Sequence, residues 1–122
     1  MSELAGRTIL VVEDEPLIAL LLEAMLHELG CQVLGPARNL EEGIALAHDG
    51  KFDCAMLDIN LKGKRSDAIV EILGQRRIPY LIATGYGGDW PELRDAIVLE
   101  KPYQLPDVER ALGRVLIAGN PG

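Results

Sequence analysis

The sequence predicts an α/β fold in which a parallel sheet of five strands carries helices on both faces. Short, mostly apolar runs alternate with segments whose apolar residues recur every three or four positions. The runs are apolar throughout rather than at every second residue, as expected of strands that are buried on both faces. Such alternation favours right-handed crossovers and a doubly wound sheet.

The predicted elements follow one another in a regular order along the chain. Between the fourth and fifth strands, three glycines and a proline within residues 85–91 disfavour a regular helix, so this helix is expected to be short or irregular. Residues 61–66 are predicted to be a polar loop. The strands are predicted at residues 7–12, 31–34, 54–57, 78–83 and 97–99, and the regular helices at 16–29, 40–48, 67–76 and from about 105 onward.

Helix boundaries are marked by residues that suit helix ends. Pro16 suits the first turn, where its missing N–H is not needed. Gly30 suits a C-terminal cap, and Asn39 with Glu42 three residues later resembles a capping arrangement for the second helix. In the first helix, the apolar residues at three- and four-residue spacing should pack on the sheet: Ile18, Leu21, Leu22, Met25, Leu26 and Leu29.

Length and charge exclude several classes of function. The 122 residues suit one domain, with a core from about residue 7 to residue 117. With 19 acidic and 12 basic residues the net charge is −7, which argues against binding to nucleic acid. No apolar stretch approaches the ~20 residues of a membrane span, and the N-terminus lacks a signal-peptide pattern. Cys31 and Cys54 lie outside any CxxC motif, which favours free thiols and a cytoplasmic location.

Polar residues follow four of the predicted strands, at the edge where ligands bind in sheets of this kind. Glu13 and Asp14 follow the first strand, Asp58 the third, Thr84 the fourth and Lys101 the fifth. Asp58 ends a buried run, where an unpaired charge would be costly. Three converging carboxylates repel one another unless a cation is present. Mg²⁺ fits, because it takes one or two carboxylates, several waters and phosphate oxygens.

The same residues indicate phosphoryl transfer. A metal ion, the ammonium of Lys101 and the hydroxyl of Thr84 together supply what a phosphoryl group needs as its charge spreads in an in-line displacement. A carboxylate that attacks phosphorus forms an aspartyl phosphate. We therefore expect Asp58 to be the nucleophile of this site.

In order and strand placement, Glu13-Asp14, Asp58, Thr84 and Lys101-Pro102 resemble the receiver domain of two-component response regulators over about residues 7–117. The resemblance implies a flavodoxin-like sheet of strand order 2-1-3-4-5. It further implies that Asp58 accepts a phosphoryl group from the phosphohistidine of a sensor histidine kinase or a histidine phosphotransferase.

The resemblance also implies roles for the residues around the phosphoacceptor. Asp14, Asp58 and the backbone carbonyl of Asn60 would bind Mg²⁺, with Glu13 acting mainly through water. Thr84 and Lys101 would contact phosphoryl oxygens.

Several positions near the site suggest how phosphorylation is read out. Val98 stands where receiver domains usually carry an aromatic residue, and the peptide before Pro102 is expected to be cis. The resemblance further implies that Tyr86 and Asn60 tune access of water to the aspartyl phosphate. Tyr86 and Tyr103 can also be read as packing residues.

Residues 82–86, Ile-Ala-Thr-Gly-Tyr, resemble the FATGUY subgroup of single-domain regulators, with Ile82 in place of its phenylalanine. This subgroup is associated with sensor kinases of the HWE and HisKA2 types. In this subgroup, signalling is expected to pass through ordering of residues 85–93.

The favoured function is a signalling domain that catalyses only its own phosphorylation and dephosphorylation, and so is not a turnover enzyme. Its output would pass through contacts with a downstream protein, with no nucleic acid or membrane partner. Two alternatives within this class are a phosphate sink and a receiver domain cut from a hybrid kinase. A haloacid-dehalogenase-like phosphatase fits less well, because that family places a second acid where this chain has Asn60 and puts its nucleophile after the first strand.

Overall fold

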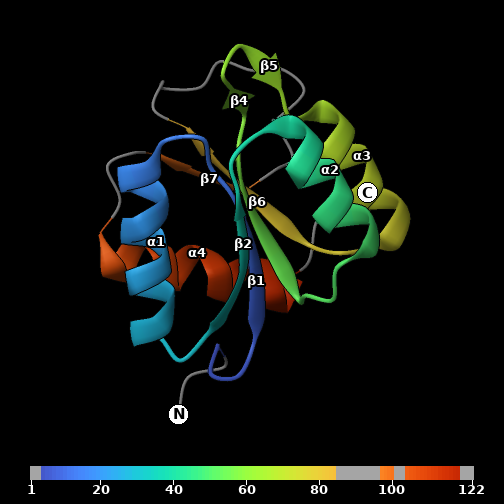
Figure 1. Ribbon diagram of the computed structural model, residues 1–122. Helices are drawn as coiled ribbons and strands as arrows, with labels where there is room; N and C mark the ends of the chain where they lie inside the picture. Colours follow the sequence, from blue (N-terminus) through green and yellow to red (C-terminus); the bar gives the residue numbers. More distant parts are fainter. Residues whose placement is uncertain (1–3, 85–96, 101–103, 119–122) are drawn as a thin grey trace.

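The computed structural model describes residues 4–84, 97–100 and 104–118, and it confirms the predicted fold class (Figure 1). The main sheet contains β1 (Thr8–Val12), β2 (Gln32–Ala37), β3 (Cys54–Asp58), β6 (Tyr80–Thr84) and β7 (Ile97–Glu100), while β4 (Asn60–Leu61) and β5 (Lys64–Arg65) form a separate pair. The helices are α1 (Pro16–Glu28), α2 (Leu40–Asp49), α3 (Asp67–Arg76) and α4 (Leu105–Ala118).

The five strands of the main sheet are parallel and lie in the order β2-β1-β3-β6-β7. This is the predicted order 2-1-3-4-5, because β6 and β7 are the fourth and fifth strands of that sheet along the chain. The fourth helix that the sequence predicts to be short or irregular falls within residues 85–96, which lie outside the described residues.

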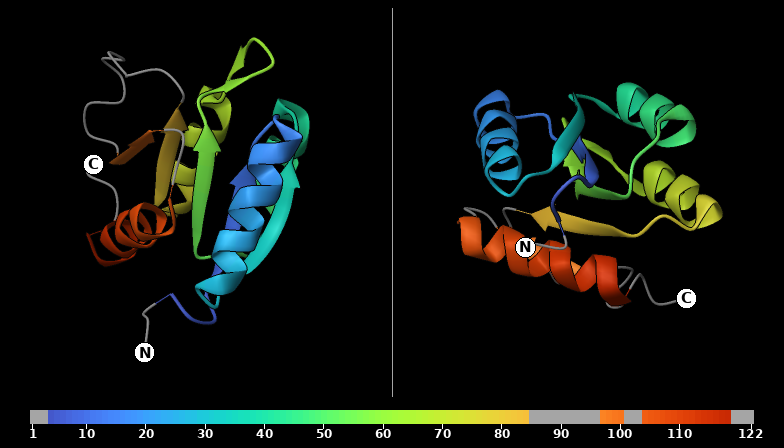
Figure 2. Two further views of the ribbon diagram at one scale, coloured as in Figure 1. Left: turned by 90° about the vertical axis from the view of Figure 1, so that its left-hand side faces the viewer. Right: turned by 90° about the horizontal axis from the view of Figure 1, so that it is seen from below.

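The helices form two layers that enclose the sheet, with α1 and α4 on one face and α2 and α3 on the other (Figures 1 and 2). Successive residues of β1 point to opposite layers. Ile9 and Val11 pack with the core beneath α1 and α4, whereas Leu10 and Val12 pack with the core beneath α2 and α3. Burial of both faces explains why the strand runs are apolar throughout. None of the helices in the described ranges is both long and apolar enough to cross a membrane.

The second strand is longer than the sequence indicates. We expected it to end at residue 34 before Gly35-Pro36, but β2 continues to Ala37 through a cis Gly35–Pro36 peptide bond. The pairing of β2 with β1 is irregular between Leu10 and Val12 and resumes with Val12 beside Ala37. An edge strand tolerates this interruption, because a proline there need not donate a hydrogen bond to a second neighbour.

Two further predictions of local structure were wrong. Residues 61–66 are not a plain loop, because Asn60–Leu61 and Lys64–Arg65 pair as antiparallel strands. Leu21 does not belong to the buried face of α1 and is 42% exposed, whereas the smaller Ala19 is buried. Leucines occur on several sides of this helix, so the apolar pattern alone does not fix which of them face the sheet.

Candidate functional site

The parallel register of β1 and β3 brings the predicted acidic residues together. Val12 on β1 lies beside Leu57 on β3. The next residues, Glu13 and Asp58, therefore reach the carboxyl edge of the sheet as neighbours. One carboxylate oxygen each from Glu13, Asp14 and Asp58 lies within 4.8 Å of the others. Glu13 and Asp58 are buried and Asp14 is half-buried, so the group is largely shielded from solvent.

Backbone hydrogen bonds hold two of these acids in place. The N–H of Glu13 donates to the carbonyl of Ala37 at 2.9 Å, and its carboxylate accepts the N–H of Glu15 at 3.1 Å. The carboxylate of Asp14 accepts the backbone N–H of Lys62 at 3.0 Å. The acids therefore belong to a site built from the ends of β1, β2 and β3 and from the hairpin that β4 and β5 form.

The donor set fits a hard divalent cation. Three carboxylates at this separation repel one another, and oxygen ligands of this kind are what Mg²⁺ prefers. Glu13, Asp14 and Asp58 could each offer one oxygen. Asn60, whose backbone carbonyl is the remaining predicted ligand, opens β4 two residues after Asp58.

The remaining predicted site residues are described in part. Asp58 on β3 lies beside Ala83 on β6. Thr84, the last residue of β6, directly follows Ala83. Val98 lies in β7 beside Ile82. Lys101 directly follows the last residue of β7. The predicted roles of Lys101, Pro102, Tyr103 and Tyr86, together with the signalling role of residues 85–93, concern positions outside the described residues.

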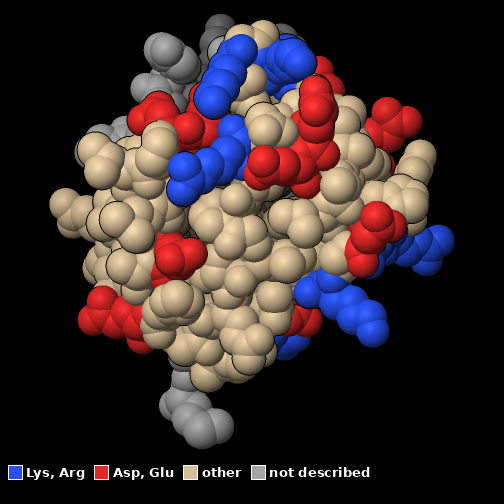
Figure 3. Space-filling model, viewed as in Figure 1, with Lys and Arg blue, Asp and Glu red and all other residues tan. Residues whose placement is uncertain are grey.

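Sequence reasoning missed two features beside the site. The first is the backbone N–H of Lys62; its only sequence signal is the Lys62-Gly63 pair, since a glycine in a two-residue turn is typical of hairpins. The second is a group of exposed leucines on α1, Leu17 at 80%, Leu20 at 63% and Leu21 at 42%, in the helix that follows the acids. In the view of Figure 3, basic and acidic side chains lie interspersed in the upper part of the molecule.

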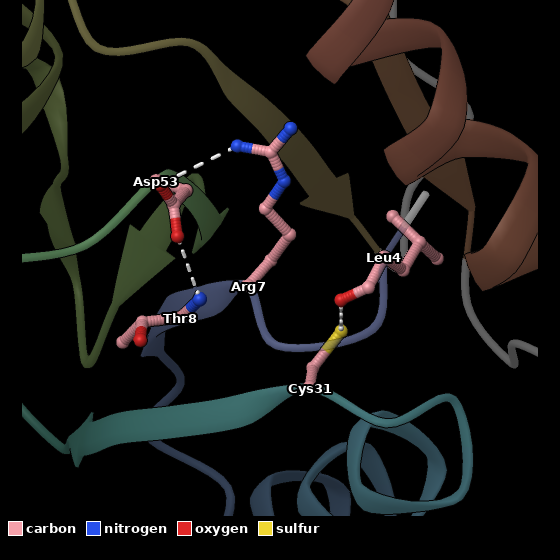
Figure 4. Close-up of polar contacts among 5 residues, drawn as sticks. All are labelled: Leu4, Arg7, Thr8, Cys31 and Asp53. Carbon is pink, nitrogen blue, oxygen red and sulfur yellow. Dashed lines mark hydrogen bonds and ion pairs between the residues drawn. The ribbon is translucent and has the colours of Figure 1, made fainter. Parts of the chain in front are cut away.

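The opposite end of the sheet is held by structural contacts (Figure 4). Asp53 accepts the N–H of Thr8 at 2.8 Å and lies 3.6 Å from the guanidinium of Arg7. The thiol of Cys31 donates to the carbonyl of Leu4 at 3.3 Å. Burial raises the pKa of Cys31 and raises that of Cys54 to about 12, so both thiols stay protonated and unreactive near neutral pH.

Comparison with known proteins gives one family. Residues 9–107 match the response regulator receiver domain. The chain is 35% identical over 116 residues to the phyllosphere-induced regulator PhyR of Methylorubrum extorquens, covering 88% of this chain and 43% of PhyR. The chain thus spans about half the length of the curated relatives it matches.

Two solved structures match over nearly the whole length of their chains. SdrG of Sphingomonas melonis Fr1 is 39% identical with a TM-score of 0.82, and the match covers 95% of this chain and 99% of SdrG. The receiver domain of the sensor histidine kinase PA1611 of Pseudomonas aeruginosa PAO1, solved with a magnesium ion in its active-site cleft, is 25% identical with a TM-score of 0.79, covering 92% and 98%. From the matched sequence, the strand order and the converging acids, the chain belongs to the response regulator receiver domain family.

Proposed function

We propose that this domain is the phosphoacceptor of a two-component phosphorelay and that Asp58 is the residue phosphorylated. The observation that carries the proposal is the approach of the Glu13, Asp14 and Asp58 carboxylates within 4.8 Å at the carboxyl edge of a receiver-domain sheet. The resemblance of residues 82–86 to the FATGUY subgroup favours a sensor kinase of the HWE or HisKA2 type as the donor.

In the proposed reaction, a carboxylate oxygen of Asp58 attacks the phosphorus of a phosphohistidine. The new O–P bond forms as the P–N bond breaks, and the electron pair of that bond stays on the imidazole nitrogen. Bound Mg²⁺ would offset the negative charge of the carboxylates and of the phosphoryl oxygens. Asp14 and the carbonyl of Asn60 would hold the ion beside Asp58, and Glu13 would act mainly through water.

The residues at the ends of β6 and β7 complete the proposed site. The hydroxyl of Thr84 and the ammonium of Lys101 would contact phosphoryl oxygens as charge builds up on them. The magnesium ion in the active-site cleft of the PA1611 receiver domain supports the choice of metal for the corresponding acids here. The domain would then alter only its own phosphorylation state and act on no other substrate.

The exposed leucines of α1 support docking of a kinase close to Asp58. Leu17 and Leu20 lie in the first turns of the helix that begins just after Glu15, so exposed apolar side chains follow the acidic residues directly along the chain. Leu17, Leu20 and Leu21 stand at three- and four-residue spacing and so share one side of the helix, and exposed apolar patches of this kind mark protein contacts. We assign this surface to the helical, histidine-bearing domain of the donor kinase.

The proposal is tested by incubating the protein with phosphoramidate, with and without Mg²⁺, and measuring its intact mass. We expect a single phosphoryl adduct that requires Mg²⁺ and is absent from Asp58→Asn. Asp53→Asn is the matched control, because it removes a carboxylate at the other end of β3 yet keeps an oxygen for the N–H of Thr8. An adduct that forms in Asp58→Asn, or equally well in EDTA, contradicts the proposal.

The lifetime of the adduct separates a signalling role from a phosphate sink. In a sink, rapid loss of the phosphoryl group is itself the function, so the adduct would decay faster than a downstream partner could respond. Family membership speaks against the haloacid-dehalogenase alternative, for which sustained turnover of a phosphate ester would be required.

A further inference from the structure

The residues that join Asp58 to α3 form a small β-hairpin above the carboxyl edge of the sheet (Figures 1 and 2). Leu61 pairs with Lys64, which leaves Lys62 and Gly63 as a two-residue turn. Both turn residues have positive φ, 54° and 86°. Positive φ at both positions is the signature of the type I′ turn, whose twist matches that of the paired strands.

The base of the hairpin is anchored in the protein core. Ile59 and Leu61 are 2% and 1% exposed, and Ser66 is buried as well. The N–H of Ser66 donates to the carbonyl of Ile59 at 3.0 Å. Arg65 makes two contacts with the carboxylate of Asp67, at 3.0 and 3.1 Å. These contacts hold the two ends of the hairpin in place and so position its turn.

The tip of this hairpin reaches the acidic cluster. The backbone N–H of Lys62 donates to Oδ2 of Asp14 at 3.0 Å, across 48 positions of sequence. A lysine is unfavourable in the left-handed conformation that this turn requires. The hydrogen bond occupies one carboxylate oxygen of Asp14 and leaves the second able to accept a metal ion.

We propose that the hairpin is a positioning element of the metal site, in which the N–H of Lys62 fixes the Asp14 carboxylate in the orientation that binds Mg²⁺. The inference rests on the proposed function in taking Asp14 as a metal ligand. Hydrogen bonds that orient ligating carboxylates are worth about 10- to 100-fold in metal affinity when removed. Because β4 also contains Asn60, the same hairpin carries a second proposed ligand.

Mg²⁺ binding and the hydrogen bond between Lys62 and Asp14 should strengthen each other. If the hairpin contact strengthens Mg²⁺ binding, bound Mg²⁺ must strengthen the contact by the same factor. The amide of Lys62 should therefore exchange its hydrogen more slowly when Mg²⁺ is bound. Mg²⁺ would thus order the backbone of the hairpin tip, which carries the exposed Lys62.

Gly63→Ala tests the inference, with Gly6→Ala as a matched control. Both glycines have positive φ, 86° and 82°, and at neither position would an added Cβ meet another atom within 4 Å. Both substitutions therefore place an alanine at nearly the same positive φ without a clash, but only Gly63 belongs to the hairpin. Alanine at position 63 strains the turn but leaves the donating N–H of Lys62 in place, so the effect should be smaller than full loss of the contact. Calorimetric titration with Mg²⁺ should show that Gly63→Ala raises the Kd about 3- to 10-fold relative to Gly6→Ala.

A second pair of variants separates backbone conformation from charge. Lys62→Asn and Lys62→Val remove the same positive charge. Asparagine tolerates the left-handed conformation, and Asn-Gly is a preferred type I′ turn, whereas a β-branched valine is strongly disfavoured there. Lys62→Val should bind Mg²⁺ several-fold more weakly than Lys62→Asn. Amide exchange at position 62, followed by NMR, should slow on Mg²⁺ addition in Lys62→Asn and much less in Lys62→Val.

Equal Mg²⁺ affinities within both pairs would overturn the inference, even with the proposed function intact. So would exchange of the Lys62 amide that Mg²⁺ does not change in the wild-type protein. A wild-type protein that binds no Mg²⁺ would instead refute the proposed metal site, and the positioning role would fall with it.

Discussion

The carboxylate of Asp14 and the backbone N–H of Lys62 form a hydrogen bond of 3.0 Å that joins the end of β1 to the hairpin after β3. It brings the segment that follows Asp58 back onto the acids that follow β1. The proposed metal site and the loop that follows Asp58 are therefore one connected structure.

Replacing Asp14 by asparagine should weaken Mg²⁺ binding at least tenfold. The amide oxygen can still accept the N–H of Lys62, but the charge that attracts the cation is lost. Calorimetric titration measures the effect. Glu15→Gln is the control, because Glu15 is exposed and lies outside the acidic cluster. Equal losses of affinity in the two variants would indicate a general charge effect rather than ligation by Asp14.

The convergence of the acids could be predicted from sequence because it depends on few physical constraints. Strands that are apolar throughout and alternate with helices are expected to form a parallel sheet covered on both faces, and the carboxyl ends of parallel strands meet at one edge. Once Glu13 and Asp58 are known to end two such strands, their approach follows from the register of β1 and β3.

The hairpin could not be predicted in the same way. Its strands are only two residues each, too short to show any alternation of polar and apolar side chains. Its shape depends on the backbone of Lys62 adopting a positive φ, which lysine rarely does. The exposure of Leu21 was missed because leucine occurs on several sides of α1.

The exposed leucines of α1 should matter for a protein donor and not for a small one. The double variant Leu17→Gln/Leu20→Gln should be tested with an HWE or HisKA2 kinase that phosphorylates the wild-type protein. Its rate of phosphorylation should fall about tenfold or more, because loss of buried apolar contacts weakens docking. Phosphorylation by phosphoramidate should be unchanged. Equal slowing with both donors would show that the leucines support the site itself rather than docking.

The same helix offers a matched test of its packing. Leu26 is fully buried, whereas Leu20 is 63% exposed. Leu26→Ala should lower the free energy of unfolding by about 2–5 kcal/mol, because it removes buried contacts and leaves a cavity. Leu20→Ala should change it by less than about 0.5 kcal/mol. Urea denaturation measures both, and similar losses would show that α1 does not pack on the sheet as described.

The buried thiol of Cys54 should make the fold less stable in alkaline solution. Its pKa is raised from 9.0 to about 12 by burial, so between these values the unfolded chain loses the proton that the folded chain keeps. The contribution of the protonated thiol to stability is therefore fully present below pH 9. Between pH 9 and pH 12 the free energy of unfolding falls by up to about 1.4 kcal/mol per pH unit.

Comparison with Cys54→Ala isolates this effect from other groups that titrate in the same range. The variant should be less stable at neutral pH, yet its stability should fall less steeply above pH 9 in urea denaturation series. Parallel pH curves for the two proteins would show that the thiol is not desolvated as its burial indicates.

The most direct measurement is to locate the phosphoryl group itself. Borohydride reduces an aspartyl phosphate to homoserine, so the protein phosphorylated by phosphoramidate and Mg²⁺ can be reduced, digested and read by peptide mass. We predict homoserine at position 58 and at no other aspartate, with Asp14 and Asp53 unmodified. Modification at another residue, or a phosphorylated protein that keeps Asp58 unchanged, would contradict the assignment of Asp58 as the phosphoacceptor.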